Sequence, residues 1–189
     1  MMVPEKWCLI HVRPGHFFSI KINLIYQLFF MNIIDMEEPM SAHFRLKEFL
    51  YSRTAERLGI PNIPLKCHIL RIRNLTVNCL EPTRLQLCRP ILITSGYRCE
   101  PLNRAVGGVS NSQHLLGEAA DIQIARRWWP LSVGSEEQMA RFLFNWMKEH
   151  IPYDQLILEH SRRGSWWVHV SCRIDMKKNR GQALQLMKE

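Results

Sequence analysis

The sequence predicts an α+β domain built from a small antiparallel sheet with helices packed on it. Helical patterns come first along the chain, short strand patterns dominate later, and repeated β–α–β units are not evident. The predicted helices span 41–59, 69–87 and 135–150, and the predicted strands span 90–94, 119–124, 155–159 and 166–172. Hairpin-like connections between the late strands favour antiparallel pairing.

The first two helices are predicted from the spacing of apolar residues and from residues that end helices. Leu46, Phe49 and Leu50 share one face of the first helix, and Gly59 is a natural C-terminal stop. The second helix shows similar spacing, but it contains Pro82, which lacks an amide hydrogen and is expected to break or restart it.

The third helix has the clearest pattern in the chain. Its apolar residues follow the i, i+3, i+4, i+7, i+8 spacing: Met139, Phe142, Leu143, Trp146 and Met147. Ser135 and Gln138 have the spacing of a capping box at its start. We therefore expect an amphipathic helix that begins near Ser135.

The strands are short and are separated by loops and turns. The apolar run 90–94 is predicted to be a buried strand. The stretch 100–113 contains proline, glycine and asparagine and is predicted to be mostly loop. The strands 155–159 and 166–172 are joined by the polar turn 161–164, which predicts a hairpin.

The composition fits one globular domain. The chain has 189 residues, 47% of them apolar, with no internal repeat or low-complexity tract. The formal net charge is +8, but lysine and arginine are scattered and no nucleic-acid-binding signature is present, so we expect no nucleic-acid partner. Six cysteines without a CxxC pair argue against a zinc finger and indicate free thiols. We expect a monomer.

Residues 1–40 differ in character from the rest of the chain. The stretch 17–34 is strongly apolar, is interrupted by Lys21 and is followed by no small-residue cleavage site. It is an atypical export signal, a short membrane-associating segment or sequence upstream of the true start, and membrane contact is expected only if it is retained. We favour the third interpretation, with translation starting at Met31, Met36 or Met40.

The predicted domain organisation has three parts. An N-terminal extension covers 1–40, the domain that carries the chemistry covers 41–176, and a C-terminal tail covers 177–189. The tail is polar and is predicted to fray.

Two predicted strands each present one metal-binding side chain on the face away from the core. In strand 119–124, Asp121 lies opposite the apolar isoleucines, and in strand 166–172, His169 lies opposite the valines. His114 precedes the first of these strands in a loop that can fold back. Two imidazoles and one carboxylate suit Zn²⁺, and three protein ligands leave a fourth position for a water whose pKa the metal lowers towards ~7.

Three motifs occur in a recognisable order. They are SGYR at 95–98, SQHLLGEAAD at 112–121 and WVHVS at 167–171. Together they closely resemble the zinc D-Ala-D-Ala carboxypeptidase family of peptidoglycan peptidases (peptidase M15), above all its small bacterial and phage-associated branch. HFRLKEF near the start and YDQLILE before the last strand are similar to the same branch, and the resemblance covers 41–172.

The resemblance implies a fold, a cofactor and a set of ligands. The implied fold is the α+β fold shared with the hedgehog signalling domain, and the implied cofactor is one Zn²⁺ per chain, held by His114, Asp121 and His169. The resemblance also implies that Arg98 binds the substrate's carboxylate or polarises the scissile carbonyl. A guanidinium suits either role because it is permanently charged and can bind through two donors.

The general base is less clearly marked. Some relatives place an acid three residues before the last zinc histidine, but this chain has Trp166 there. Glu159 is the best remaining catalytic residue for moving the proton, and His160 is the alternative. Ser112 is expected either to hydrogen-bond near the metal or substrate or to cap its loop, and Trp167 is expected to form a wall of the substrate groove.

These residues predict a zinc-dependent peptidase that hydrolyses peptide bonds in peptidoglycan stem peptides, as a D,D-carboxypeptidase or an endopeptidase. The alternative is a catalytically inactive, zinc-containing module that binds the cell wall. The protein is expected to act at the bacterial cell wall, either after export or after release from the cytoplasm as a phage-type lysin.

Overall fold

The structure, a computed structural model, describes residues 34–188 and confirms the α+β class. The five-stranded sheet has the order β1-β2-β4-β3-β5, with antiparallel neighbours except for the parallel pair β3 and β5. The strands are β1 Ile91–Ser95, β2 Ala119–Ile124, β3 Gln155–Ser161, β4 Trp166–Ser171 and β5 Gln182–Lys188. The α-helices are α2 Leu46–Leu50, α3 Arg53–Leu58, α4 Lys66–Leu75, α5 Glu81–Leu87, α6 Glu100–Ala105 and α7 Glu136–His150. Four single turns are labelled η1 Thr76–Leu80, η2 Gln113–Leu116, η3 Arg126–Trp128 and η4 Met176–Lys178.

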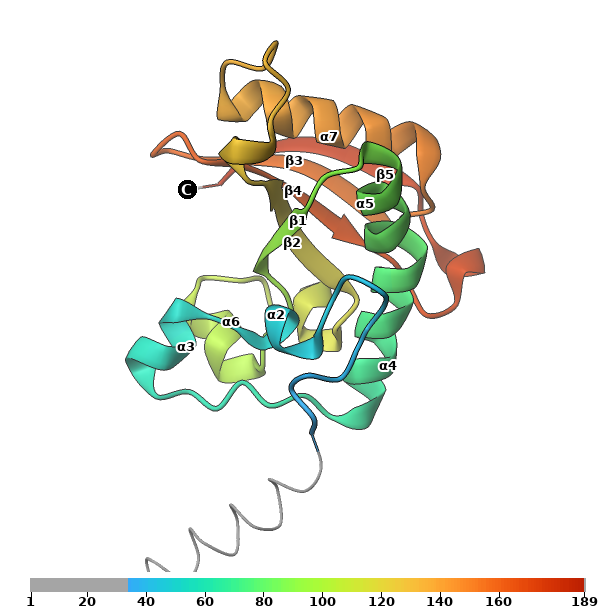
Figure 1. Ribbon diagram of the computed structural model, residues 1–189. Helices are drawn as coiled ribbons and strands as arrows, with labels where there is room; N and C mark the ends of the chain where they lie inside the picture. The colour runs from blue at the N-terminus through green and yellow to red at the C-terminus, as the bar shows by residue number, and fades with distance from the viewer. Residues whose placement is uncertain (1–33, 189) are drawn as a thin grey trace, which may run out of the picture. The chain divides into compact units, whose positions relative to one another are not determined.

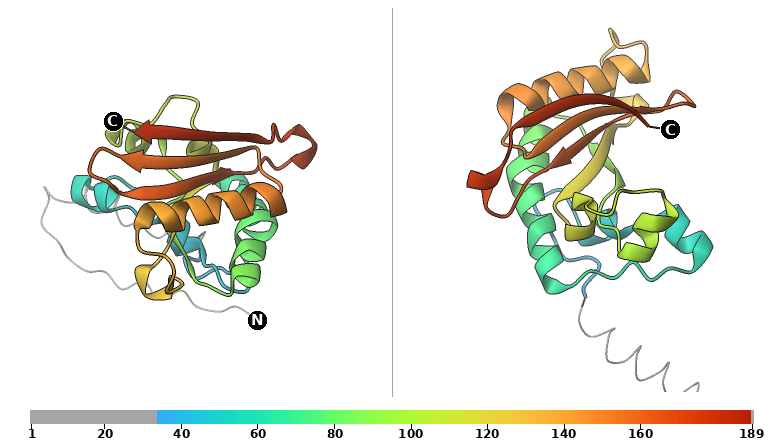
Figure 2. Two further views of the ribbon diagram at one scale, coloured as in Figure 1. Left: turned by 90° about the horizontal axis from the view of Figure 1, so that it is seen from above. Right: turned by 180° about the vertical axis from the view of Figure 1, so that it is seen from behind.

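The two faces of the sheet have different partners. Helix α7 lies across one face, and α2, α3 and α6 gather beyond the other (Figures 1 and 2). The core between α7 and the sheet is formed by fully or almost fully buried apolar side chains: Ile122, Met139, Leu143, Met147, Leu156, Leu158, Val168 and Val170. Because side chains alternate between the two faces along a strand, the polar residues next to these apolar ones point away from α7.

Helix α7 begins as predicted, although its apolar stripe is narrower. The Ser135 hydroxyl accepts a hydrogen bond from the Gln138 backbone N–H at 3.1 Å and caps the helix. The Gln138 side chain accepts from the Gly134 N–H at 2.8 Å, so the expected reciprocal half of the capping box is absent here. Phe142 is 42% exposed, whereas Leu143 is buried.

The first predicted helix is two helices, which corrects the single span 41–59. The backbone is extended at Tyr51 and Ser52, between α2 and α3. The Ser52 hydroxyl then accepts from the Ala55 N–H at 3.3 Å and starts α3 as its N-cap. The predicted stop at Gly59 is confirmed, because this residue takes the left-handed conformation with φ of 63°.

Pro82 does not break the second predicted helix, but a new α-helix, α5, restarts beside it, which is one of the two expected outcomes. The helical path runs from α4 through the π-helical turn η1 into α5, and Pro82 lies in the first turn of α5. The Glu81 N–H bonds to the Thr76 carbonyl five residues back, which is the wide π pattern. This wider turn accommodates the proline, which has no N–H to donate and whose ring would crowd a regular helix.

Two other loop predictions have different outcomes. The hairpin β3–β4 forms as expected around a turn in which Gly164 has φ of 83°. The stretch 100–113 is not mostly loop at its start, because α6 occupies Glu100–Ala105. Pro101 lies in the first helical turn, where the missing amide hydrogen costs nothing.

The compact part of the chain starts earlier than predicted. It begins at Met36, so residues 36–40, which were predicted to belong to the extension, are part of the compact unit. Met40 is fully buried, and Glu38 forms an ion pair with Arg73 at 2.6 Å. Residues 1–33, which hold nearly all of the predicted apolar segment and Met31, lie outside the described residues. Between residues 34 and 188, no helix combines the length and apolar character needed to cross a bilayer.

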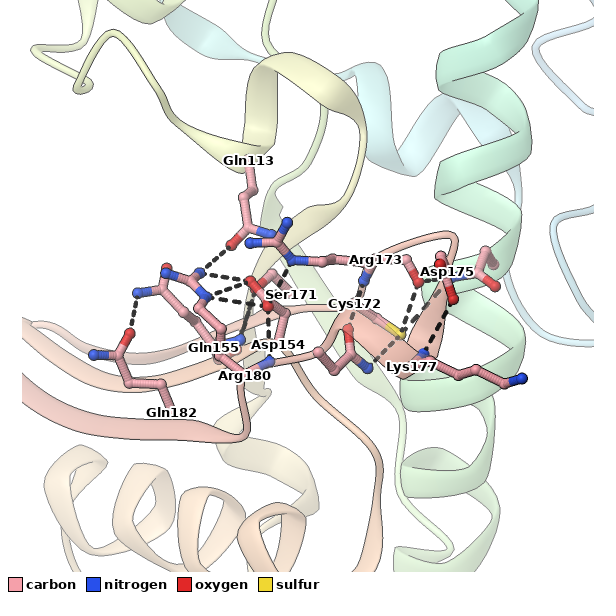
Figure 3. Close-up of polar contacts among 12 residues, drawn as sticks. Gln113, Asp154, Gln155, Ser171, Cys172, Arg173, Asp175, Lys177, Arg180 and Gln182 are labelled. Carbon is pink, nitrogen blue, oxygen red and sulfur yellow. Dashed lines mark hydrogen bonds and ion pairs between the residues drawn. The ribbon is translucent and has the colours of Figure 1, made fainter.

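Residues 182–188 of the C-terminal tail form strand β5, which corrects the prediction that the tail 177–189 frays. Strand β5 pairs with β3 along its whole length, from Gln155 opposite Gln182 to Ser161 opposite Lys188. Figure 3 shows the anchor of this strand, the buried Asp154 with arginines around it. Asp154 accepts from Arg173 Nε at 2.8 Å, from the Arg180 backbone N–H at 2.9 Å and from Arg180 Nη2 at 2.5 Å.

We expect Asp154→Asn to destabilise the fold by about 3 kcal/mol near neutral pH, because it leaves two arginines beside an uncharged group. Burial alone would raise the pKa of Asp154, but hydrogen bonds from Arg180 and Arg173 hold it well below its ordinary value. The contribution is therefore present above the unfolded pKa of ~3.9 and is lost as pH falls towards the lower folded pKa. Urea unfolding of both proteins from pH 7 to pH 2 measures this difference.

Asp175→Asn is the matched control for this experiment. Asp175 is exposed and caps η4 through the Lys177 N–H, a role that asparagine fills equally well. Its ion pair with the exposed Lys178 at 3.4 Å contributes little to stability. Its unfolding free energy should match wild type. Equal stability of the two variants at pH 7 would contradict the anchoring role of Asp154.

Candidate metal centre

The pairing of β2 with β4 brings the first two predicted ligands together. Asp121 lies directly opposite His169 in the antiparallel register, while the neighbouring pair Ile122 and Val168 points into the core under α7. Directly opposed residues share a face, so both ligands project from the face away from α7. Both are buried, with exposed fractions of 6% and 7%.

The third ligand, His114, arrives on the short helix η2, which ends at Gly117. Gly117 has φ of 74°, and a Cβ there would meet the His68 carbonyl oxygen at 2.7 Å. Only glycine suits this turn, because a side chain would be strained by the backbone and would collide with α4. The turn leads directly into β2, so His114 and Asp121 lie on either side of it and converge.

The three side chains present ligand atoms at distances that suit one metal ion. His114 Nε2 lies 3.3 Å from His169 Nδ1 and 3.3 Å from Asp121 Oδ1, and His169 Nδ1 lies 2.9 Å from Asp121 Oδ1. Two ligands on a tetrahedral zinc with bonds of ~2.0–2.2 Å are roughly 3.3–3.6 Å apart. Among residues 34–188, this is the one group of three histidine, cysteine or acidic side chains with such geometry. The residues therefore fit the predicted zinc.

The surroundings fix the orientation of the His114 ring. Its Nδ1 lies 2.7 Å from the Gly96 carbonyl oxygen, which can only accept, so Nδ1 carries the proton and Nε2 offers its lone pair to the metal. Gly96 itself packs against α2, where a Cβ would come within 2.4 Å of the Phe49 carbonyl oxygen. Glycine at this position lets the carbonyl reach the imidazole.

The ionisation of the ligands also suits a metal. Burial lowers the pKa of His114, which favours the neutral imidazole. Burial alone would raise the pKa of Asp121, but His114 and His169 lie against it and hold that pKa well below its ordinary value. A neutral imidazole and an ionised carboxylate are the forms that bind metal.

Arg98 contacts a metal ligand. Its Nη2 donates to Asp121 Oδ2 at 2.8 Å, and its Nε donates to Ser95 Oγ at 2.9 Å. Asp121 can therefore offer Oδ1 to the metal while Oδ2 stays on the guanidinium. The SGYR motif contains Arg98, Ser95 and Gly96, but nothing in the sequence indicates the Arg98–Asp121 pairing or the contacts of Ser95 and Gly96.

Glu159 lies on the same face as the ligands. Strand β3 places it opposite Trp167, and the next pair on that face is Ile157 with His169. Glu159 is 3% exposed, and its Oε2 accepts a hydrogen bond from Trp167 Nε1 at 2.6 Å. Diagonal neighbours of this kind lie roughly 7–8 Å apart, close enough for a water to bridge the carboxylate and a metal-bound group.

His160 and Trp166 lie on the other face. They oppose each other across β3 and β4, and their rings stack with centroids 4.3 Å apart. Arg141 of α7 lies over the Trp166 ring at 5.1 Å, which places this pair on the side that α7 covers. The geometry therefore favours Glu159 over His160 as the base.

Ser112 and the cysteines complete the set of predicted residues. Ser112 is half-buried immediately before η2, and its side chain makes no capping hydrogen bond to that helix. Its predicted contact with the substrate stays a prediction. The five cysteines in the described part of the chain are free, and none belongs to the metal cluster, as expected.

The fold and this site define an α+β domain with a candidate metal centre of three protein ligands, His114, Asp121 and His169. The family model for peptidase M15 matches residues 42–171, well over half of the chain. The chain belongs to the peptidase M15 family, whose members are zinc-dependent metallopeptidases, as the three motifs predicted. No curated protein sequence matches the chain significantly.

Proposed function

We propose that this protein is a zinc-dependent peptidase that hydrolyses a peptide bond in peptidoglycan stem peptides, as a D,D-carboxypeptidase or an endopeptidase. One observation carries the proposal: His114, Asp121 and His169 converge on the same sheet face as the buried carboxylate of Glu159. Metal-assisted hydrolysis requires a metal site and a proton acceptor close to it.

The three ligands would hold the zinc, which when bound supplies a Lewis acid and lowers the pKa of a water in its open position. Asp121 contributes one carboxylate oxygen, and Arg98 keeps the other oxygen in place at 2.8 Å. Such support from a second residue fixes the orientation of a ligand before the metal arrives. Gly96 gives His114 the same support through its carbonyl group.

Glu159 takes the role of general base and acid. Its carboxylate would accept a proton from the attacking water and deliver that proton to the nitrogen of the leaving amine. The Trp167 indole N–H donates to one of its oxygens at 2.6 Å, which fixes the position of the carboxylate on the metal-bearing face. Trp167 lies next to His169 on the same face of β4, and we propose that it contacts the substrate there.

Arg98 and Ser112 are proposed to contact the substrate. The Arg98 guanidinium has five N–H donors, of which the pairs with Ser95 and Asp121 use two. The remaining donors suit a carbonyl oxygen that becomes negatively charged during attack. Ser112 precedes η2, close in sequence to His114, and supplies a hydroxyl at the edge of the same site.

The test is to incubate purified muropeptides with the zinc-loaded protein and to analyse the products by mass spectrometry. Loss of a terminal D-Ala would show a carboxypeptidase, and cleavage within the stem would show an endopeptidase. Folded, zinc-loaded protein that yields no product from any muropeptide would contradict the proposal. Retention of that inactive protein on insoluble peptidoglycan would identify a cell-wall binding module instead.

A further inference from the structure

A basic cluster borders the metal-bearing face at the end opposite Glu159. Along β4, Trp167 and its partner Glu159 lie on one side of His169, and Ser171 follows on the other side of it. Beyond Ser171, Arg173 and Arg180 surround Asp154 (Figure 3). The proton acceptor and the basic cluster therefore flank the metal ligands from opposite ends of the same face.

The cluster carries a surplus positive charge at the surface. Asp154 is fully buried, whereas the side chains of Arg173 and Arg180 are 39% and 45% exposed. Two guanidinium groups against one carboxylate leave a net charge of about +1 on the exposed side, because an arginine never loses its proton in a protein. Asp154 holds Arg180 through Nε and Nη2, so the guanidinium is fixed in orientation before any ligand binds.

Gln113 links this cluster to the metal site. It directly precedes the ligand His114, and its Oε1 accepts from Arg180 Nη2 at 3.4 Å. Figure 3 shows the Gln113 amide lying over the two guanidinium groups. The Nε2 donor of Gln113 is buried and has no hydrogen-bond acceptor among the described residues. A buried donor beside two cations is costly unless an acceptor, best an anion, comes to it.

We propose that Arg180 and Gln113 form a subsite for one carboxylate group of the substrate, an inference that rests on the proposed peptidase function. Gln113 directly precedes the metal ligand His114, so the subsite adjoins the metal centre. It therefore receives a carboxylate from a residue close to the scissile bond. The single surplus charge matches one carboxylate. The substrate is thus an acidic peptide, and Arg180 helps to select it.

The experiment uses a synthetic pentapeptide stem and counterparts in each of which one free carboxylate is converted into a carboxamide. Wild-type zinc-loaded enzyme should prefer the acid over the amide at one position by about tenfold or more in kcat/KM, the range of a charge-assisted hydrogen bond. In Arg180→Gln this preference should fall to near unity, and Arg180→Lys should keep part of it. The acid-to-amide ratio within one variant does not depend on how much of the enzyme is folded.

Arg163→Gln is the matched control, because Arg163 is exposed in the β3–β4 turn at the far end of the sheet. It should keep the wild-type ratio. A wild-type enzyme that cleaves acid and amide equally at every position, or an unchanged ratio in Arg180→Gln, would overturn the subsite while leaving the peptidase intact. If wild type cleaves no peptide, the peptidase proposal fails, and calorimetry of peptide binding then tests the subsite. Weaker binding of the acid peptide, but not of the amide, by Arg180→Gln supports the subsite. Equal Kd values for wild type and Arg180→Gln with the acid peptide overturn it.

Discussion

Glutamine at position 159 is expected to lower kcat by about 10²–10⁴-fold while zinc stays bound at one ion per chain. The amide keeps the size of the carboxylate and can still accept the 2.6 Å hydrogen bond from the Trp167 indole, so the local packing survives. It cannot take a proton from water. Product formation from muropeptides gives kcat, and atomic absorption on the same samples gives the zinc content.

The neighbouring histidine provides the control. His160 lies on the α7 side of the sheet and stacks on Trp166, so His160→Gln should retain kcat and zinc. The two variants change adjacent residues that point to opposite faces. Wild-type activity in Glu159→Gln, or a large loss of kcat confined to His160→Gln with unchanged thermal unfolding, would show that the base is misassigned.

Removal of a metal ligand should reduce hydrolysis even more than the change at Glu159. We expect His169→Ala to weaken zinc binding by more than about 100-fold, since loss of a mere supporting partner already costs 10–100-fold. Hydrolysis should disappear with the metal. The protein should remain folded, because Arg98 still neutralises the buried Asp121 carboxylate at 2.8 Å. Competition with a chromophoric chelator measures the affinity, and circular dichroism reports the fold.

His150→Ala is the comparison for the ligand variant. His150 lies exposed at the end of α7, where it stacks on Trp146, far from the metal-bearing face in the fold. Its zinc affinity should equal that of wild type. Stoichiometric zinc in His169→Ala at wild-type affinity would mean that the metal is held elsewhere.

Strands β2 and β4, which carry Asp121 and His169, could be predicted because polar and apolar residues alternate along them. The predicted bounds of β2 agree with the structure, since polar Asp121 and Gln123 alternate with buried Ile122 and Ile124. The same alternation in β4 placed His169 on the face of Asp121. Spacing alone could not bring His114 to them; the family motif supplied it, and the structure gives the reason in the turn at Gly117.

The C-terminal strand could not be predicted because its causes are distant in the sequence. Strand β5 pairs in parallel with β3, although β4 separates the two in the sequence, and β5 is anchored by the buried Asp154. In the sequence, Asp154, Arg173 and Arg180 look like ordinary loop charges. The contact of Arg98 with Asp121 was missed for a related reason: a guanidinium suits a substrate carboxylate and a protein carboxylate equally well.

X-ray absorption at the zinc edge of the wild-type protein identifies the atoms that bind the metal. We expect one zinc per chain with only nitrogen and oxygen neighbours at ~2.0–2.2 Å, including two imidazoles. Free cysteines lie elsewhere in the fold, so sulfur ligation is a real competitor that this measurement resolves. A sulfur shell at ~2.3 Å, or zinc far below one per chain, would contradict a site built from His114, Asp121 and His169.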